Sequence, residues 1–99
     1  MDSDNIINLD TVVARAGESV FSQVDGEVVM MSIENGEYYG INLIGSRIWG
    51  LLESPVRVSD VCDILLPDYD VTREQCTKDI LLFLQQMVEK GNITIVNAK

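Results

Sequence analysis

Residues 35–42 read NGEYYGIN, and they mark the point where the sequence changes from strand to helix patterning. Asn35-Gly36 is a dipeptide that favours the type I′ turn of a β-hairpin, and Asn42 has a side chain suited to cap a helix. Apolar residues alternate before this stretch, whereas after it they recur about every 3.6 residues. We therefore predict a strand over residues 37–42 that leads into a first helix beginning after Asn42.

A second hairpin dipeptide, Asp25-Gly26, lies upstream within a β-rich run that starts at Glu18. The two turns together predict a three-stranded antiparallel meander. If both loops have two residues, Phe21 faces Met30, Gln23 faces Val28, Ile33 faces Tyr38 and Met30 faces Ile41. One face then holds Phe21, Val28, Met30, Tyr39, Ile41 and Leu43, and the other holds Val20, Val24, Val29, Met31, Ile33 and Tyr38. Because both faces are apolar, we expect this chain or a partner to cover the second one.

Downstream signals predict two further helices and a final strand. Ser54-Pro55 ends the first helix, and a short second helix runs from Ser59 to Pro67. Thr72 and Gln75 form a capping-box pattern at the start of a third helix that ends at Gly91-Asn92, before a strand over 93–96. The expected fold class is α+β and winged helix-turn-helix-like: an N-terminal three-stranded antiparallel sheet, three helices and a short C-terminal strand. We expect residues 1–17 to be a loosely ordered arm able to supply one pairing segment, and residues 18–99 to be the domain.

The third helix has an unusually wide apolar surface. One stripe comprises Cys76, Ile80, Phe83 and Met87, and the neighbouring stripe comprises Thr77, Leu81, Leu84 and Val88. Together they span about 160° of the helix, more than the ~100° that one packing surface needs. Either the helix packs on two sides, or one stripe faces the core while the edge of the other lines a groove.

Composition excludes several classes of function. The 99 residues suffice for one domain and contain no histidine, which removes imidazole-based catalysis and histidine ligation of zinc. No arrangement of residues indicates a catalytic centre, a metal site or a cofactor site, so we expect neither an enzyme nor a cofactor. Cys62 and Cys76 lie in apolar periodic segments, where buried free thiols are expected. The sequence shows no signal peptide or membrane span, which favours a cytoplasmic protein.

The charge balance argues against nucleic acid and anionic membranes as partners. Sixteen acidic and seven basic side chains give a net charge of -9 and a pI near 4.1. In a winged helix the third helix would be the recognition helix, but here three basic residues (Arg73, Lys78, Lys90) are matched by three acidic ones (Glu74, Asp79, Glu89). A DNA-binding role would need a basic stripe to displace counterions from the duplex.

The third strand of the meander is the best candidate for a binding site. Residues 38–41, Tyr-Tyr-Gly-Ile, contain neither proline nor lysine to block pairing, and Gly40 would allow another backbone to approach closely. An extended peptide could add to this edge as a further strand. The alternative is that the N-terminal arm or the strand over 93–96 covers the edge.

The sequence resembles the PqqD-like family, the recognition elements that bind leader peptides in pathways for ribosomally made, modified peptides. The residues that carry the resemblance are Asn35 to Asn42, Gly45, Arg47-Ile48-Trp49 and Leu51-Leu52, and it extends more loosely from Val20 to Val96. It implies a winged helix-turn-helix-like fold whose third strand pairs with the leader while the third helix walls the groove. The implied contacts are Tyr38, Tyr39, Gly40 and Ile41 on the strand and Asp79, Ile80, Phe83, Leu84 and Met87 on the helix.

The resemblance also implies partners. Ser54-Pro55-Val56 follows the first helix where many members of the quinone-cofactor branch have an Asp-Gly turn, which favours a stand-alone protein of a lasso-peptide pathway. Such a protein would deliver the precursor to a separate cysteine-type leader protease, with a cyclase as a further partner, and would be a monomer or weak dimer. The rival hypotheses are a winged-helix DNA-binding regulator and a structural dimerisation subunit.

Overall fold

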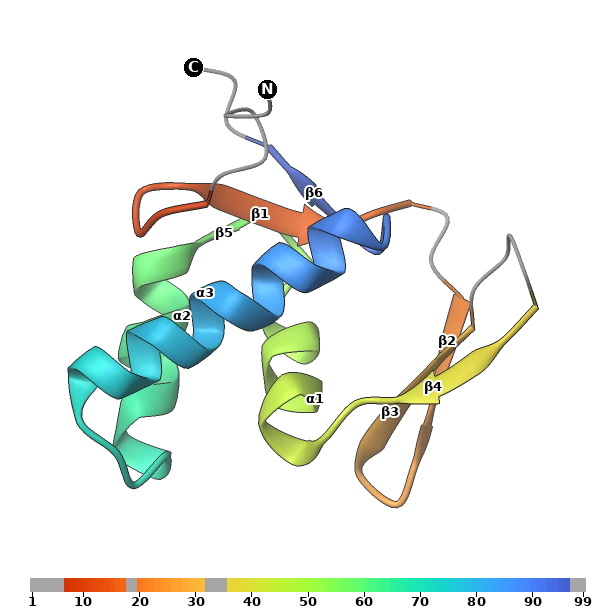
Figure 1. Ribbon diagram of the computed structural model, residues 1–99, viewed down its shortest axis with the longest axis horizontal. Coiled ribbons are helices and arrows are strands. Elements are labelled where there is room, and N and C mark those ends of the chain that lie inside the picture. Colours follow the sequence, from red (N-terminus) through yellow and green to blue (C-terminus); the bar gives the residue numbers. More distant parts are fainter. Residues whose placement is uncertain (1–6, 18–19, 32–35, 97–99) are drawn as a thin grey trace.

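The computed structural model describes residues 7–17, 20–31 and 36–96. Along the chain the elements are β1 (Val12–Arg15), β2 (Val20–Val24), β3 (Glu27–Met31), β4 (Tyr38–Gly40), α1 (Leu43–Leu51), β5 (Val56–Arg57), α2 (Val58–Leu65), a 3-10 turn (Leu66–Asp68), α3 (Arg73–Glu89) and β6 (Ile93–Ile95). They form an α+β fold with two antiparallel sheets and three helices (Figure 1).

The helix ends follow the local sequence signals. The Asn42 side chain accepts a hydrogen bond of 2.8 Å from the Gly45 N–H and caps α1, and the Thr72 hydroxyl accepts one of 3.1 Å from the Gln75 N–H and caps α3. Helix α3 ends in a Schellman motif, because Gly91 has a φ of +83° and the Asn92 N–H donates to the Met87 carbonyl. These three predicted boundaries are confirmed.

Strands β2, β3 and β4 form the predicted meander. Asp25 and Gly26 have φ values of +54° and +85° and turn the chain between β2 and β3, where Phe21 pairs with Met30 as predicted. The predicted pairing of β3 with β4 is wrong by two residues, since Tyr39 faces Met30 and Tyr38 faces Met31. Strand β3 ends at Met31 and β4 begins at Tyr38, so the two-residue loop we predicted is not where the strands meet. Residues 32–35, and with them the expected pairing of Ile33, lie outside the described residues.

The register shift leaves the two faces of the meander almost unchanged. A shift of two residues preserves the alternation of side chains, so Val28, Met30 and Ile41 share the buried face as expected. Leu43 does not join them, because it is the first residue of α1 and is exposed. On the opposite face Val20, Val24 and Tyr38 are exposed, and no described element covers them.

A second sheet, in the order β5-β1-β6, was not predicted. Its central strand β1 comes from residues 12–15, and Val13 is completely buried between Val56 of β5 and Ile95 of β6. Residues 12–15 thus supply the pairing segment that we expected the N-terminal arm to be able to provide; residues 1–6 lie outside the described part. The boundary between an arm and a domain at residue 18 stays a prediction.

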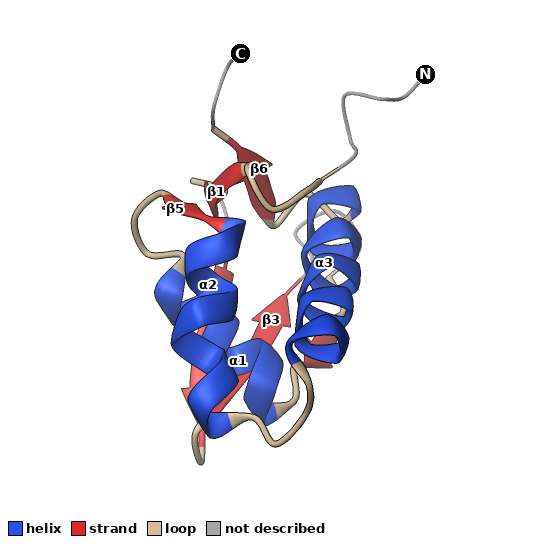
Figure 2. Cartoon of the chain, turned by 90° about the vertical axis from the view of Figure 1, so that its left-hand side faces the viewer, coloured by secondary structure: helices blue, strands red, loops and turns tan. Residues whose placement is uncertain are grey.

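The helices stand between the two sheets. Figure 2 shows α1, α2 and α3 gathered together, with β1, β5 and β6 across one end, as in a winged helix. In Figure 1 the meander lies on the side of α1 that is turned away from α2. Side chains from all three helices, from β1 and β6 and from the inner face of the meander belong to one core, which includes Trp49, Leu65 and Ile80. The core thus holds the meander against the helical half.

Candidate functional site: the edge of β4 and helix α3

The outer edge of β4 is open in the described part of the chain. The Ile41 N–H donates to the Val28 carbonyl at 2.8 Å, so the N–H groups of Ile41 and, two residues earlier, Tyr39 point toward β3. The backbone groups of Tyr38 and Gly40 consequently point away from the sheet. Strands β1 and β6 pair with each other in the second sheet, so neither the described part of the N-terminal arm nor the strand near the C-terminus pairs with this edge.

The space around Gly40 is open. A Cβ atom added at this residue would have no other heavy atom within 4 Å, and the residue is exposed. A peptide that pairs with β4 would meet no side chain there.

Helix α1 packs tightly between β4 and α3. A Cβ atom at Gly45 would overlap the Ile41 side chain and lie 2.8 Å from Cε1 of Phe83, so only glycine fits. Ser46 of α1 links the helix to β3 and to the residue after β4. Its hydroxyl accepts a hydrogen bond from the Val28 N–H at 2.8 Å and donates one to the Ile41 carbonyl at 3.1 Å. The first turn of α1 thereby fixes the spacing between the open edge and α3.

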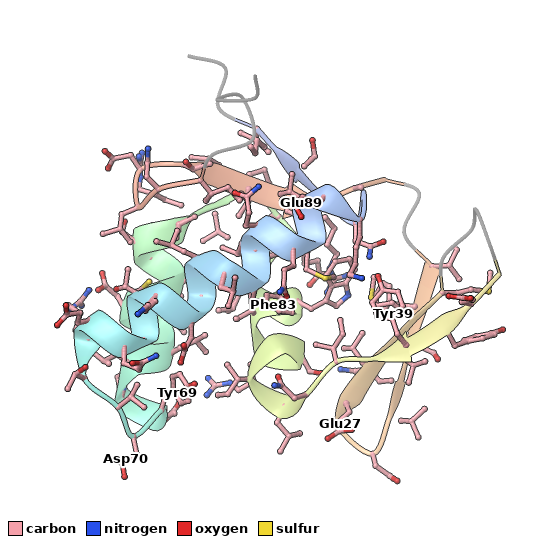
Figure 3. The ribbon with its side chains drawn as sticks, viewed as in Figure 1. Glu27, Tyr39, Tyr69, Asp70, Phe83 and Glu89 are labelled. Carbon is pink, nitrogen blue, oxygen red and sulfur yellow. The ribbon has the colours of Figure 1, made fainter. Side chains whose placement is uncertain are left out.

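The side chain of Tyr39 joins β4 to the end of α3. Its hydroxyl accepts a hydrogen bond from the Asn92 side-chain amide, and the Lys90 ammonium lies 5.0 Å from the centre of its ring. Figure 3 shows Tyr39 on the side of β4 that faces the helices, with Phe83 projecting from α3 toward α1.

A pocket of about 290 Å³, here called the α1–α3 pocket, opens between α1 and α3 beside this edge. Its apolar lining comes from Ile44, Ile48, Leu82 and Phe83, and its polar lining from Asn42, Tyr69, Asp79 and Gln86, with Gly45 completing the set. Both Asp79 oxygens accept hydrogen bonds of 2.8 Å, one from the Tyr69 hydroxyl and one from the Gln75 amide. The hydrogen bond to Asp79 raises the pKa of Tyr69.

The structure divides the predicted helix contacts into two groups. Asp79 and Phe83 line the α1–α3 pocket, whereas Ile80, Leu84 and Met87 are almost completely buried in the core. The inward stripe is Cys76, Ile80, Leu84 and Met87, so Leu84, not Phe83, completes the core-facing set. In this structure the three residues are therefore part of the core and have almost no exposed surface.

The four predicted strand residues lie together on β4 and the residue that follows it. Tyr38 and Gly40 are exposed, Tyr39 is half-buried and Ile41 is buried. Sequence reasoning missed Leu82 and Gln86 on α3, Ile44 on α1 and Tyr69. Leu82 is 60% exposed and shares a helix face with Asp79 and Gln86 at spacings of three and four, a signal that could have identified it.

No catalytic or metal-binding arrangement emerges from the described residues. They contain no cluster of three or more Cys, Asp or Glu side chains able to hold a metal ion, and Cys62 and Cys76 are free, buried thiols as predicted. No helix in the described part is long and apolar enough to cross a membrane. The candidate site consists of a pocket with apolar lining and of backbone hydrogen-bonding groups at the edge of β4.

These features define a small winged-helix-like domain in which an open sheet edge faces a helix, a geometry suited to an extended peptide. The chain belongs to the PqqD family: the family described as coenzyme PQQ synthesis protein D (PqqD) matches residues 27–93. The resemblance inferred from residues 35–52 is thereby confirmed.

Two solved structures are similar to this chain. The first is TbiB1 in complex with the TbiA(beta) leader peptide, with 30% sequence identity, a TM-score of 0.74 and coverage of 87% of this chain and 99% of that chain. The second is lasso peptide synthetase B1 complexed with the leader peptide, at 24% identity and a TM-score of 0.72, covering 83% and 96% of the two chains; it supports the fold alone. No curated protein sequence matches this chain.

Proposed function

We propose that this protein binds the leader of a ribosomally made precursor peptide, of the lasso-peptide class, as a fourth strand on β4. The observation that carries the proposal is the outward direction of the Tyr38 and Gly40 backbone groups beside the α1–α3 pocket. Family membership and the similarity to TbiB1, a protein solved with a leader peptide, support it.

In binding by strand addition, the backbone and the side chains of the leader make different contacts. Hydrogen bonds to Tyr38 and Gly40 set the register of the leader, and alternate leader side chains point toward α3. There they meet Tyr39, Phe83 and the α1–α3 pocket, which favours an aromatic or aliphatic anchor. Because a disordered leader loses conformational entropy on binding, we expect a dissociation constant on the order of nanomolar to micromolar.

In this proposal the protein delivers a substrate and catalyses no reaction itself. The protein holds the leader while a separate leader protease of the cysteine type, and a cyclase, act on the precursor, so the core peptide is concentrated at their active sites. We place this activity in the cytoplasm and expect a monomer or weak dimer. A net charge of -9 disfavours DNA and anionic membranes as partners.

Fluorescence anisotropy with a labelled leader tests the proposal. The probes are the TbiA(beta) leader peptide and candidate leaders of lasso-peptide precursors, with a scrambled peptide of the same composition as the control. We expect saturable binding of at least one leader and none of its scrambled form. Equal binding of leader and scrambled peptides, or none of either, contradicts the proposal.

A matched pair of α3 variants tests the helix wall. Phe83→Ala should weaken leader binding about tenfold or more because it removes part of the pocket wall, whereas Leu81→Ala, also half-buried but outside the pocket, should not. Both variants lose stability, since truncation of a packed apolar side chain costs roughly 2–5 kcal/mol. Circular dichroism therefore has to show that each variant is folded. An unchanged leader affinity in folded Phe83→Ala contradicts a contact between Phe83 and the leader.

A further inference from the structure

Two opposite charges lie at the two ends of the proposed leader groove. Asp79 lines the α1–α3 pocket at the end where β4 leads into α1. Lys90 caps α3 at the other end, where its ammonium group lies over the ring of Tyr39. The proposal below rests on the proposed function and concerns how a leader is selected.

The charge of Asp79 has no cationic partner among the described residues. Its two hydrogen-bond donors, the Tyr69 hydroxyl and the Gln75 amide, are neutral, so they orient the carboxylate without neutralising it. The ion pairs within the described part join Arg47 to Asp68 and Arg73 to Asp63. An orientated carboxylate above apolar Ile44, Leu82 and Phe83 suits a lysine or arginine whose aliphatic stem lies on that lining.

Lys90 is the basic residue that the structure places at β4. Arg15 stacks on Phe21 and Trp49 and donates to the Trp49 carbonyl, and Arg57 donates to the Asp10 carbonyl, so both are held elsewhere. The Lys90 ammonium lies 5.0 Å from the centre of the ring of Tyr39, a residue of β4. In a protein of net charge -9, an acidic leader side chain would need such a local cation.

The distance between the charges sets a spacing along the leader. Asp79 and Lys90 are 11 residues apart, about 16 Å along a helix that rises 1.5 Å per residue. An extended peptide covers this length in about five residues, and only alternate side chains face α3. We infer that Asp79 and Lys90 together select a leader that carries a basic and an acidic residue four or six positions apart, the basic one at the α1 end.

Charge scanning of a bound peptide tests this inference. The probe is the labelled TbiA(beta) leader, in which each position in turn is replaced by Lys and by Glu, and affinity is measured at 50 mM and 1 M NaCl. The protein variants are Asp79→Asn and Lys90→Gln. Asp70→Asn and Lys78→Gln make the same changes of charge outside the pocket and serve as controls.

With the unmodified protein we expect a gain in affinity of about threefold to fivefold at one position for Lys, and a similar gain four or six positions away for Glu. Asp79→Asn should abolish only the Lys gain and Lys90→Gln only the Glu gain, the two controls should keep both, and 1 M NaCl should suppress both. Either order of the two positions along the peptide supports the inference, and the order reveals the direction of the bound strand.

Failure of the inference can be told apart from failure of the proposed function. If the protein binds the probe but neither gain depends on Asp79 or Lys90, the inference is overturned and leader binding stands. If no leader binds the unmodified protein, both are overturned.

Discussion

Two glycines in α1 have opposite roles. Gly45 lies where any Cβ atom would collide with Ile41 and Phe83, whereas a Cβ atom at Gly50 would meet nothing within 4 Å. We expect Gly45→Ala to lower the free energy of unfolding by about 1–3 kcal/mol through overpacking. Gly50→Ala should raise it by about 0.5–1 kcal/mol, because alanine is the better helix former.

Urea denaturation of both variants measures these effects. Equal stability changes in the two variants would contradict the tight contact at Gly45. The result also bears on the site, since this contact sets the distance between β4 and α3.

The two cysteines should make the protein less stable at alkaline pH. Burial raises the pKa of Cys62 and of Cys76 above the ordinary value of 9.0. As the pH rises, the thiols of the unfolded chain therefore lose their protons at a lower pH than those of the folded chain. The contribution of the buried thiols to the free energy of unfolding is fully present below about pH 9 and declines above it. In Cys76→Ala the decline between pH 8 and 10, followed by urea denaturation, should be shallower than in the unmodified protein, whatever the variant's stability at pH 7.

The raised pKa of Tyr69 adds a decline of the same sign. Tyr69→Phe is therefore the control that separates the phenol from the thiols. An identical slope in Cys76→Ala and the unmodified protein would contradict a role for this thiol.

Strand β4 can be tested at a single backbone N–H group. In Gly40→Pro the outward-pointing N–H is lost while the β3–β4 hydrogen bonds of Tyr39 and Ile41 remain, so we expect leader affinity to fall at least tenfold. Gly40→Ala keeps the N–H and has room for its methyl group, so it should bind within about twofold of the unmodified protein. Anisotropy titrations measure both affinities.

Thermal unfolding must show that Gly40→Pro is folded before its affinity is interpreted. Undiminished binding by the folded proline variant would rule out strand addition at this edge.

The elements that could be predicted from the sequence are those with local signals. Asn42, Thr72 and Gly91 set helix ends through hydrogen bonds within a few residues, and Asp25-Gly26 makes its turn from its own backbone preferences. Strands β1 and β5 have only four and two residues, too few for a period to show. Their existence depends on pairing across long stretches of chain, which local patterns do not encode.

The candidate site could be predicted from the sequence on β4 and less well on α3. The strand residues follow from the alternation and the absence of blocking residues, but the rotation of α3 does not follow from its periodicity. Phe83 and Leu84 are neighbours about 100° apart, and both fit an apolar stripe. Leu84 is buried in the core, whereas Phe83 lies at the pocket next to Gly45 of α1. This contact joins residues far apart in the sequence, so the helical periodicity of α3 does not predict it.

The two sheets and three helices behave as one unit at the scale of the whole molecule. The radius of gyration of 13.1 Å is that expected for one compact domain of about 100 residues, and one hydrophobic core contains residues from both sheets. A leader bound between β4 and α3 would touch the meander and the helical half together. Its binding energy should therefore stabilise the entire chain against unfolding.

Thermal unfolding separates the leader-binding function from the DNA-binding rival. A leader at 100 times its dissociation constant should stabilise the protein by about 2.7 kcal/mol, or roughly 10–20 °C in Tm for a chain of this size. Duplex DNA at the same concentration in low salt should leave Tm unchanged and show no mobility shift, because α3 with Lys90 carries as many acidic as basic residues in a protein of charge -9. A rise in Tm with DNA but not with leader would reverse this assignment, because any ligand that prefers the folded chain must raise its stability.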